Sequence, residues 1–118
     1  MMVVADAITG KVITTLATGE GTDGAAFDPL LRRAYSSNGE GTVTVVQEVT
    51  PDKYEVLENI PTRRGARTIA VDKKTHYLLL TTAEFGPAPE KSEANPHPRP
   101  SITEGTFTLF ELAPAITK

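Results

Sequence analysis

The chain has 118 residues, 39% hydrophobic and 23% charged, which suits one globular domain or part of one and excludes a disordered or fibrous composition. It has no cysteine, which excludes a disulfide framework, a thiolate metal site and a cysteine nucleophile. Its net charge of −3 argues against a dedicated nucleic-acid or anionic-membrane binder, and no apolar run approaches the length of a membrane span.

Short segments rich in β-branched and aromatic residues alternate with turn residues along the whole chain, a pattern typical of antiparallel strands. In chain order we predict strands at residues 2–5, 12–16, 24–27, 33–37, 42–48, 54–60, 68–71, 77–83 and 106–112. No stretch keeps the 3.6-residue period of a helix, so we expect at most one helical turn, around residues 89–94. The predicted fold class is therefore all-β.

The predicted strands recur at a regular spacing. Residues 1–4 align with residues 43–46 at an offset of 42, and residues 25–28 align with residues 69–72 at an offset of 44. A third repeat of the pattern begins at residues 105–109, which align with residues 41–45. A repeat of this length that carries four short strands matches one blade of a β-propeller.

The repeat resembles the signature of the YVTN-repeat β-propeller family. The segments that carry the resemblance are Ala26-Phe27-Asp28-Pro29, Tyr35-Ser36-Ser37-Asn38, Gly41-Thr42-Val43-Thr44-Val45-Val46, Val3-Val4-Ala5-Asp6 and Thr9-Gly10-Lys11-Val12. The similarity covers nearly the whole chain outside residues 86–104. The second unit departs from it, because Leu79-Leu80-Thr81-Thr82 stands where the signature tetrapeptide is expected.

The resemblance implies a ring of seven blades in complete members, so we expect antiparallel four-stranded blades of an incomplete β-propeller ring. Residues 1–18 would form half a blade, 19–61 a full blade, and 62–112 an incomplete blade interrupted by a proline-rich insertion at 86–104. Such a chain is a fragment, a shortened member or a subunit that must assemble. A self-contained sandwich of nine strands is the alternative. The resemblance also suggests a periplasmic or extracellular location, although we find no signal peptide in this chain.

Positions that recur across the repeats predict the hydrophobic core. They are Val3, Val12, Leu16, Ala26, Phe27, Tyr35, Val43, Val45, Val56, Ile60, Ile69, Val71, Leu78, Leu80, Phe107 and Leu109. If Phe27 is buried as predicted, truncating it to alanine is expected to cost on the order of 3–5 kcal/mol.

Alternate connections of an antiparallel meander emerge at opposite ends of the sheet. One set consists of tight hairpins, whereas the set at residues 18–23, 38–41, 62–67 and 85–104 is longer, richer in glycine and more charged. Binding residues are concentrated on such loops, so we expect the site on this loop face. The predicted ligand-binding residues are Asp23, Asn38, Glu40, Arg63, Arg64, Arg67, Glu84 and His97.

Three arginines within five residues, Arg63, Arg64 and Arg67, are predicted to clamp a carboxylate or a phosphate. The alternative is a solvated loop in which one arginine pairs with Glu40 or Glu84.

Two other residues on this face also have plainer alternative roles. For Asp23 the alternative is a turn-forming role, in which its carboxylate bonds to nearby backbone, and this role is favoured over ligand binding. His97 lies in the insertion at residues 86–104. The five prolines of this insertion cannot pair into a sheet, which predicts a lid or a disordered segment. The alternative to a binding role for His97 is simple exposure to solvent.

No nucleophile elbow, zinc-protease motif, phosphate-binding loop or dinucleotide fingerprint occurs, so no catalytic residue, metal or cofactor is predicted. We predict a non-catalytic scaffold whose loop face binds a protein or a small anionic ligand. The alternative is part of a propeller enzyme, a hydrolase or oxidoreductase, whose site needs further blades. No nucleic-acid or membrane partner is expected, and the arginine cluster leaves DNA binding as a third hypothesis. Open strand edges predict self-association or pairing with missing blades.

Overall fold

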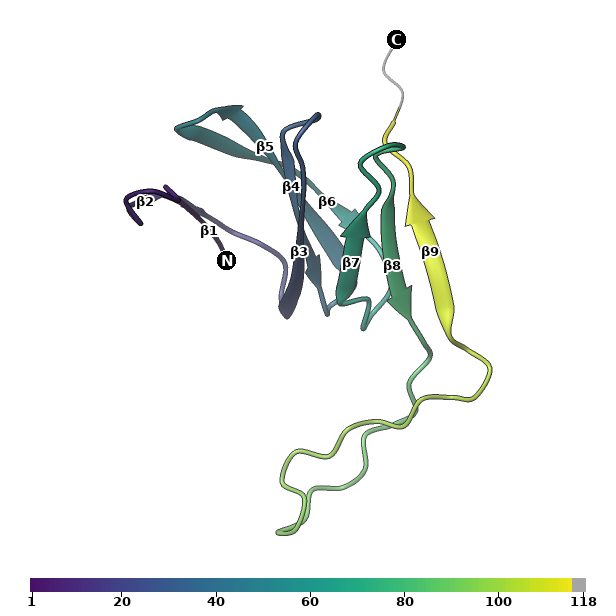
Figure 1. Cartoon of the computed structure of the whole chain (residues 1–118). Coiled ribbons are helices and arrows are strands. Elements are labelled where there is room, and N and C mark those ends of the chain that lie inside the picture. The colour runs from purple at the N-terminus through teal and green to yellow at the C-terminus, as the bar shows by residue number, and fades with distance from the viewer. Residues whose placement is uncertain (116–118) are drawn as a thin grey trace.

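The computed structural model describes residues 1–115 and contains three antiparallel sheets and no helix in that range (Figure 1). The first sheet has two strands, β1 (Met2–Ala5) and β2 (Val12–Leu16). The second has four, β3 (Thr22–Asp28), β4 (Arg33–Asn38), β5 (Thr42–Thr50) and β6 (Lys53–Pro61). The third has three, β7 (Thr68–Val71), β8 (Leu78–Thr82) and β9 (Thr108–Leu112). The predicted all-β fold class is confirmed.

Every predicted strand is present, and no strand end moves by more than two residues from its expected place. The strands β5 and β6 are longer than predicted because their ladder continues to Thr50 and Lys53 at the hairpin and to Pro61 at the far end. The helical turn expected around residues 89–94 does not form. None of the described residues belongs to a helix suited to crossing a membrane.

Three hairpins share one turn geometry that begins with an aspartate. The Oδ1 atoms of Asp6, Asp28 and Asp72 each accept hydrogen bonds from the backbone N–H groups two and three residues later. Four residues after the aspartate, the backbone is left-handed. That position holds a glycine in the first hairpin, Arg32 (φ 54°) in the second and His76 (φ 65°) in the third. The aspartate thus supplies the local hydrogen bonds that close each turn.

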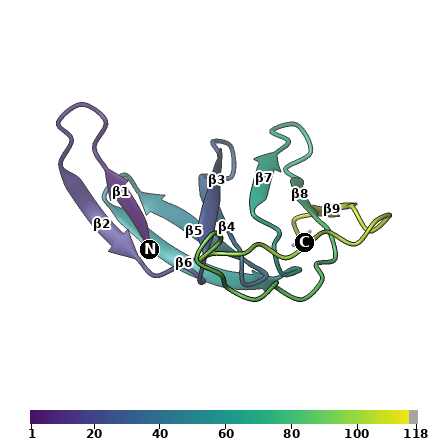
Figure 2. The same ribbon diagram turned by 90° about the horizontal axis from the view of Figure 1, so that it is seen from below.

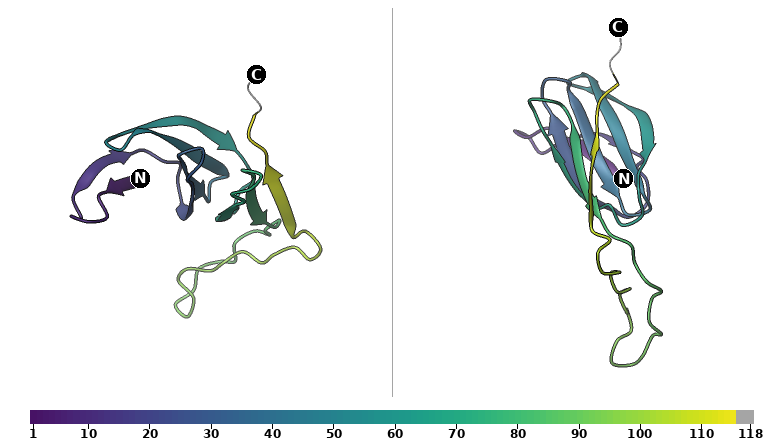
Figure 3. Two further views of the ribbon diagram at one scale, coloured as in Figure 1. Left: turned by 45° about the horizontal axis from the view of Figure 1, so that its top comes forward. Right: turned by 90° about the vertical axis from the view of Figure 1, so that its right-hand side faces the viewer.

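The sheets follow one another side by side in chain order (Figure 2). Strand β3 contacts β7 of the third sheet, and β6 contacts β2 of the first. The middle sheet is therefore flanked on both faces, and its residues 35–38 and 43–46 are buried without the usual alternation. Figure 3 shows the same succession of sheets in two further views.

The core lies between the second and third sheets. Its buried members are Tyr35, Val43, Val45, Ala66, Leu78 and Leu80. Ala26, Ile60, Ile69, Val71, Phe110 and Leu112 pack against them and are partly buried. Five of the sixteen predicted core residues, namely Tyr35, Val43, Val45, Leu78 and Leu80, are thus confirmed as buried. Phe110 and Leu112 take the place that was predicted for Phe107 and Leu109.

Six predicted core residues are instead exposed: Val3, Val12, Phe27, Val56, Phe107 and Leu109. Phe27 shows the physical reason. Side chains alternate between the two faces of a strand, and on β3 it is Ala26 and Asp28 that face inward. Phe27 therefore lies on the opposite face and keeps 46% of its surface exposed. The prediction that Phe27 belongs to the core, which rested on the recurrence of its position across the repeats, was wrong.

Candidate functional site

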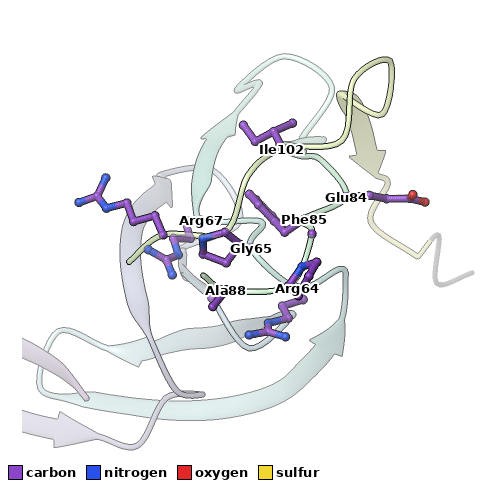
Figure 4. Close-up of a pocket in the computed structure, with 12 residues that line it drawn as sticks. Arg64, Gly65, Arg67, Glu84, Phe85, Ala88 and Ile102 are labelled. Atoms are coloured by element: carbon purple, nitrogen blue, oxygen red, sulfur yellow. The ribbon is translucent and has the colours of Figure 1, made fainter. Parts of the chain in front are cut away.

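One end of the sheets carries a groove of about 950 Å³ (Figure 4). Three connections form it: the β4–β5 turn, the β6–β7 connection, and the base of the long β8–β9 connection. We call residues 84–104 of that last connection the arm. The lining residues are Gly39, Arg64, Gly65, Arg67, Glu84, Phe85, Gly86, Pro87, Ala88, Arg99, Pro100 and Ile102.

Backbone hydrogen bonds between glycines hold the loops together at this end. The N–H of Gly39 donates to the carbonyl of Gly21 (2.8 Å), and the N–H of Gly65 donates to the carbonyl of Gly39 (2.9 Å). The N–H of Thr62 donates to the carbonyl of Gly41 (2.7 Å). Gly39 and Gly65, which line the groove, are therefore held in place by backbone hydrogen bonds and not by long side chains.

Two glycines allow groove side chains to lie directly on this surface. A Cβ atom at Gly65 would stand 2.6 Å from the ring of Phe85, and the φ of Gly65 is +79°. A Cβ atom at Gly39 would stand 3.0 Å from Nε of Arg67. Any larger residue at either position would displace the aromatic ring or the guanidinium group.

The arm leaves the sheets as a hairpin that is paired only at its base (Figures 1 and 3). Phe85 forms a bridge with Ile102, and the N–H of Gly86 donates to the carbonyl of Ser101 at 2.8 Å. The expectation that the insertion does not join a sheet holds beyond this point, since prolines remove the donors that a ladder needs. The base of the arm thus forms one wall of the groove.

The groove is cationic on an otherwise acidic chain. Arg64, Arg67 and Arg99 line it, whereas the whole chain has a net charge of −3. Within residues 1–115, no carboxylate lies within 4.0 Å of these three guanidinium groups, and none of them donates a side-chain hydrogen bond. Glu84 is the one acidic residue of the described lining, and its carboxylate points away from Phe85 and Ala88 (Figure 4).

An apolar surface accompanies the charges. Phe85 is 44% exposed and Ile102 is 64% exposed, although both are large hydrophobic residues. Pro87, Ala88 and Pro100 extend this surface along the arm. A ligand that fits here satisfies the arginines with anionic groups and covers the aromatic and aliphatic side chains at the same time.

The structure brings together three of the eight predicted site residues, Arg64, Arg67 and Glu84. Arg63 lies on the same connection as Arg64 and Arg67 but is not part of the lining, and neither is His97, which lies farther along the arm. Neither arginine pairing considered from the sequence is present in the described residues, because Glu40 accepts a hydrogen bond from Thr42 (2.8 Å) and Glu84 has no salt bridge.

Asp23 and Asn38 also lie outside the lining. Asp23 is exposed on β3. Asn38 is buried, and its amide is engaged within the fold: Nδ2 donates to Thr42 and Thr44 (both 3.0 Å), and Oδ1 accepts from Thr22 (2.8 Å). The fold thus uses the hydrogen-bonding groups that were expected to face a ligand.

A second polar cluster lies at the opposite end of the sheets. Asp28 is fully buried, and its Oδ2 is 2.5 Å from Nδ1 of His76 on the neighbouring sheet. Its Oδ1 accepts from the backbone N–H groups of Leu30 (3.0 Å) and Leu31 (3.1 Å). Burial raises the pKa of the Asp28 carboxyl, but these hydrogen bonds, that of His76 foremost, outweigh burial and hold the pKa below its usual value.

This carboxylate–imidazole pair is better suited to linking the sheets than to catalysis. The cavity beside it has about 190 Å³, below the range of roughly 300–1,000 Å³ typical of ligand pockets. Tyr35 lies at this cavity, and burial raises its pKa above the ordinary value more than the neighbouring Arg33 lowers it. In the described part of the chain, no group of three or more histidine or acidic side chains is placed to hold a metal ion.

Comparison with protein-family models, with curated proteins and with solved structures gives no match for this chain. Its function therefore has to be inferred from its own residues.

Proposed function

We propose that this chain is part of a non-catalytic β-propeller whose loop face binds an anionic ligand or protein in the groove lined by Arg64, Arg67 and Arg99. Three features support the propeller arrangement: the repeat of 42 to 44 residues, the succession of antiparallel sheets in chain order, and the contact between β3 and β7, the first strands of two successive units. Blades that lie side by side in this way present their connections on a common face.

One observation carries the binding function. Three arginines without a carboxylate partner among the described residues surround a groove of about 950 Å³ with an apolar wall. Guanidinium groups bind carboxylates and phosphates through paired hydrogen bonds, and a partly enclosed site strengthens these bonds. Binding of an anion is therefore what the groove is chemically equipped to do.

The composition of the lining favours binding over catalysis. Among the described lining residues there is no histidine, serine, lysine or tyrosine, and the single carboxylate, that of Glu84, points out of the groove. A hydrolase or oxidoreductase site needs a nucleophile, a general base or a cofactor contact at the substrate. The groove supplies positive charge and shape instead.

The test is a titration of the isotope-labelled chain with glutarate, followed by NMR of the backbone amides and the arginine Nε–H groups. We expect saturable shifts at Gly39, Gly65, Arg64, Arg67 and Arg99. The absence of any saturable shift, or shifts confined to the lysine-rich turn around residues 73–74 at the other end, would refute the proposal.

A further inference from the structure

We infer that the groove takes a short, extended acidic peptide in which carboxylates flank an apolar side chain. This inference rests on the proposed function, because it names the ligand class of the same groove. It is carried by the distribution of charge, by the apolar wall and by free backbone donors of the arm.

The cationic groups lie on both walls of the groove. Arg64 and Arg67 belong to the β6–β7 connection, which lies at the end of the sheets, whereas Arg99 belongs to the arm. A single phosphate or carboxylate can form paired hydrogen bonds with the guanidinium groups of one wall, whereas a groove of about 950 Å³ has room for a larger ligand. A ligand that engages all three arginines must therefore carry anionic groups at separate points along its length.

The surface between the charges is apolar. The ring of Phe85 lies on the backbone of Gly65, and its bridge partner Ile102 stands beside it on the other side of the arm. Close contact with the glycine backbone limits the movement of the ring, so it offers a preformed face to an apolar side chain. The middle of the ligand is thus expected to be a hydrophobic residue.

Backbone groups of the arm favour a peptide over a small dicarboxylate. The N–H groups of Ala88 and Arg99, one on each side of the arm, donate no hydrogen bond to another described residue. Both residues line the groove. Carbonyl groups of an extended peptide can accept from them, as in strand addition to a sheet edge, while its carboxylates bind the arginines. A small dicarboxylate has only its carboxylate oxygens for both tasks.

The experiment uses the complete 118-residue chain and a fluorescently labelled hexapeptide of alternating glutamate and leucine, with binding followed by fluorescence anisotropy. We expect saturable binding that weakens by about tenfold between 0.05 M and 0.5 M NaCl, because exposed charges are screened by salt. The same peptide with glutamine in place of glutamate should bind at least tenfold more weakly.

Matched variants locate the site. Arg64→Gln, Arg67→Gln and Arg99→Gln should each weaken binding by about tenfold, the loss of one charge-assisted hydrogen bond. Arg63→Gln removes a neighbouring arginine outside the lining and should change binding by less than twofold. Phe85→Ala should weaken binding by about tenfold, whereas Phe107→Ala, an exposed phenylalanine away from the groove, should not. Circular dichroism confirms that each variant keeps its sheets.

The outcomes separate the two claims. If glutarate shifts the groove residues but the peptide does not bind, the peptide inference is overturned and the proposed function stands. The same holds if the peptide binds Phe85→Ala and the three arginine-to-glutamine variants as tightly as it binds the wild-type chain. If neither probe acts at the groove, both are overturned. If the glutamine peptide binds as tightly as the glutamate peptide, the site is apolar and recognition of an acidic peptide is refuted.

Discussion

At the scale of single residues, the pair of Asp28 and His76 explains an unfavourable backbone conformation. His76 adopts a left-handed φ of 65°, which costs a side chain roughly 1–2 kcal/mol that glycine does not incur. At the same position of the first hairpin stands Gly10, whose φ is 72°. The histidine side chain reaches the buried carboxylate of Asp28 on the adjacent sheet, so the strained residue is the one that links the two sheets.

This link predicts the effect of His76→Gly. The substitution removes the backbone strain but leaves the buried carboxylate of Asp28 without its imidazole partner, and the second effect is larger. We expect a net loss of about 1–2 kcal/mol in the free energy of unfolding, measured with urea. Arg32→Gly at the equivalent turn position is the control, because its exposed salt bridge with Glu48 should contribute less than about 1 kcal/mol. Equal stability of His76→Gly and the wild type would contradict the role of the link.

The lowered pKa of Asp28 predicts how stability depends on pH. A carboxyl whose pKa is lower in the folded state than in the unfolded state stabilises the fold above the unfolded value, about 3.9. That contribution is lost as the pH falls through the folded pKa. Urea unfolding between pH 6 and pH 2 should therefore show stability falling below about pH 4.

Asp28→Asn tests this assignment. The variant should be less stable at pH 6 and should lose less stability on acidification than the wild type. Some acid sensitivity should remain, because backbone hydrogen bonds also lower the pKa values of Asp6 and Asp72. A pH profile identical to that of the wild type would show that Asp28 does not contribute.

At the scale of strands, the sequence predicted where each element lies better than which way it faces. β-Branched residues and turn residues locate a strand locally, so all nine strands were predicted. Which face of a strand a side chain occupies changes with a shift of a single residue. On β3 it is Asp28 that faces inward, where its carboxylate bonds to His76 on the adjacent sheet. No local feature of the sequence indicates that Asp28, and not Phe27, faces the core.

The exposed position of Phe27 predicts a small effect of truncation. Phe27→Ala should cost less than about 1.5 kcal/mol, in place of the 3–5 kcal/mol expected for a buried phenylalanine. Leu80→Ala, at a fully buried position, should cost about 2–5 kcal/mol and serves as the control. Urea unfolding of the two variants decides the matter, and a larger loss for Phe27→Ala would contradict the strand orientation found here.

The groove could be predicted only in part for a related reason. Arg64, Arg67 and Glu84 lie on loops that alternation along a meander assigns to one end of the sheets. Phe85 and Arg99 complete the groove only because the arm folds back on itself, and this depends on the bridge between Phe85 and Ile102. Prolines indicated that the arm would not form a sheet, but not the direction in which it would turn.

Deleting residues 87–100 and joining the ends by a short turn tests the independence of the arm. Strands β8 and β9 pair from Thr82 and Thr108 onward without any contribution from these residues, so the sheets should persist. We expect the unfolding midpoint in urea to change little and the acidic hexapeptide to bind at least tenfold more weakly, since the deletion removes Arg99 and Ala88. Loss of the β-sheet circular dichroism signal on deletion would show that the arm is required for folding.

At the scale of the whole molecule, the chain is more extended than a closed domain of its length. Its radius of gyration is 16.7 Å, whereas about 13.5 Å is expected for a compact chain of 118 residues. In the described residues, β1 and β9 each have a neighbour on one side only. Leu109 on β9 is 59% exposed and Phe107 just before it is 74% exposed. An apolar strand with free backbone donors and acceptors is a surface that proteins normally cover.

We therefore predict that the isolated chain self-associates as its concentration rises, through pairing of β9 and burial of Phe107 and Leu109. Light scattering over a hundredfold range of concentration should show a mean mass that grows above 12.6 kDa. The double variant Phe107→Lys, Leu109→Lys places charges on that edge and should shift association to at least tenfold higher concentration, whereas Ile8→Lys, at an exposed position in a hairpin turn, should not. A monomer of constant mass with cooperative unfolding would mean that the chain closes on itself, which favours a self-contained sandwich over an open succession of blades.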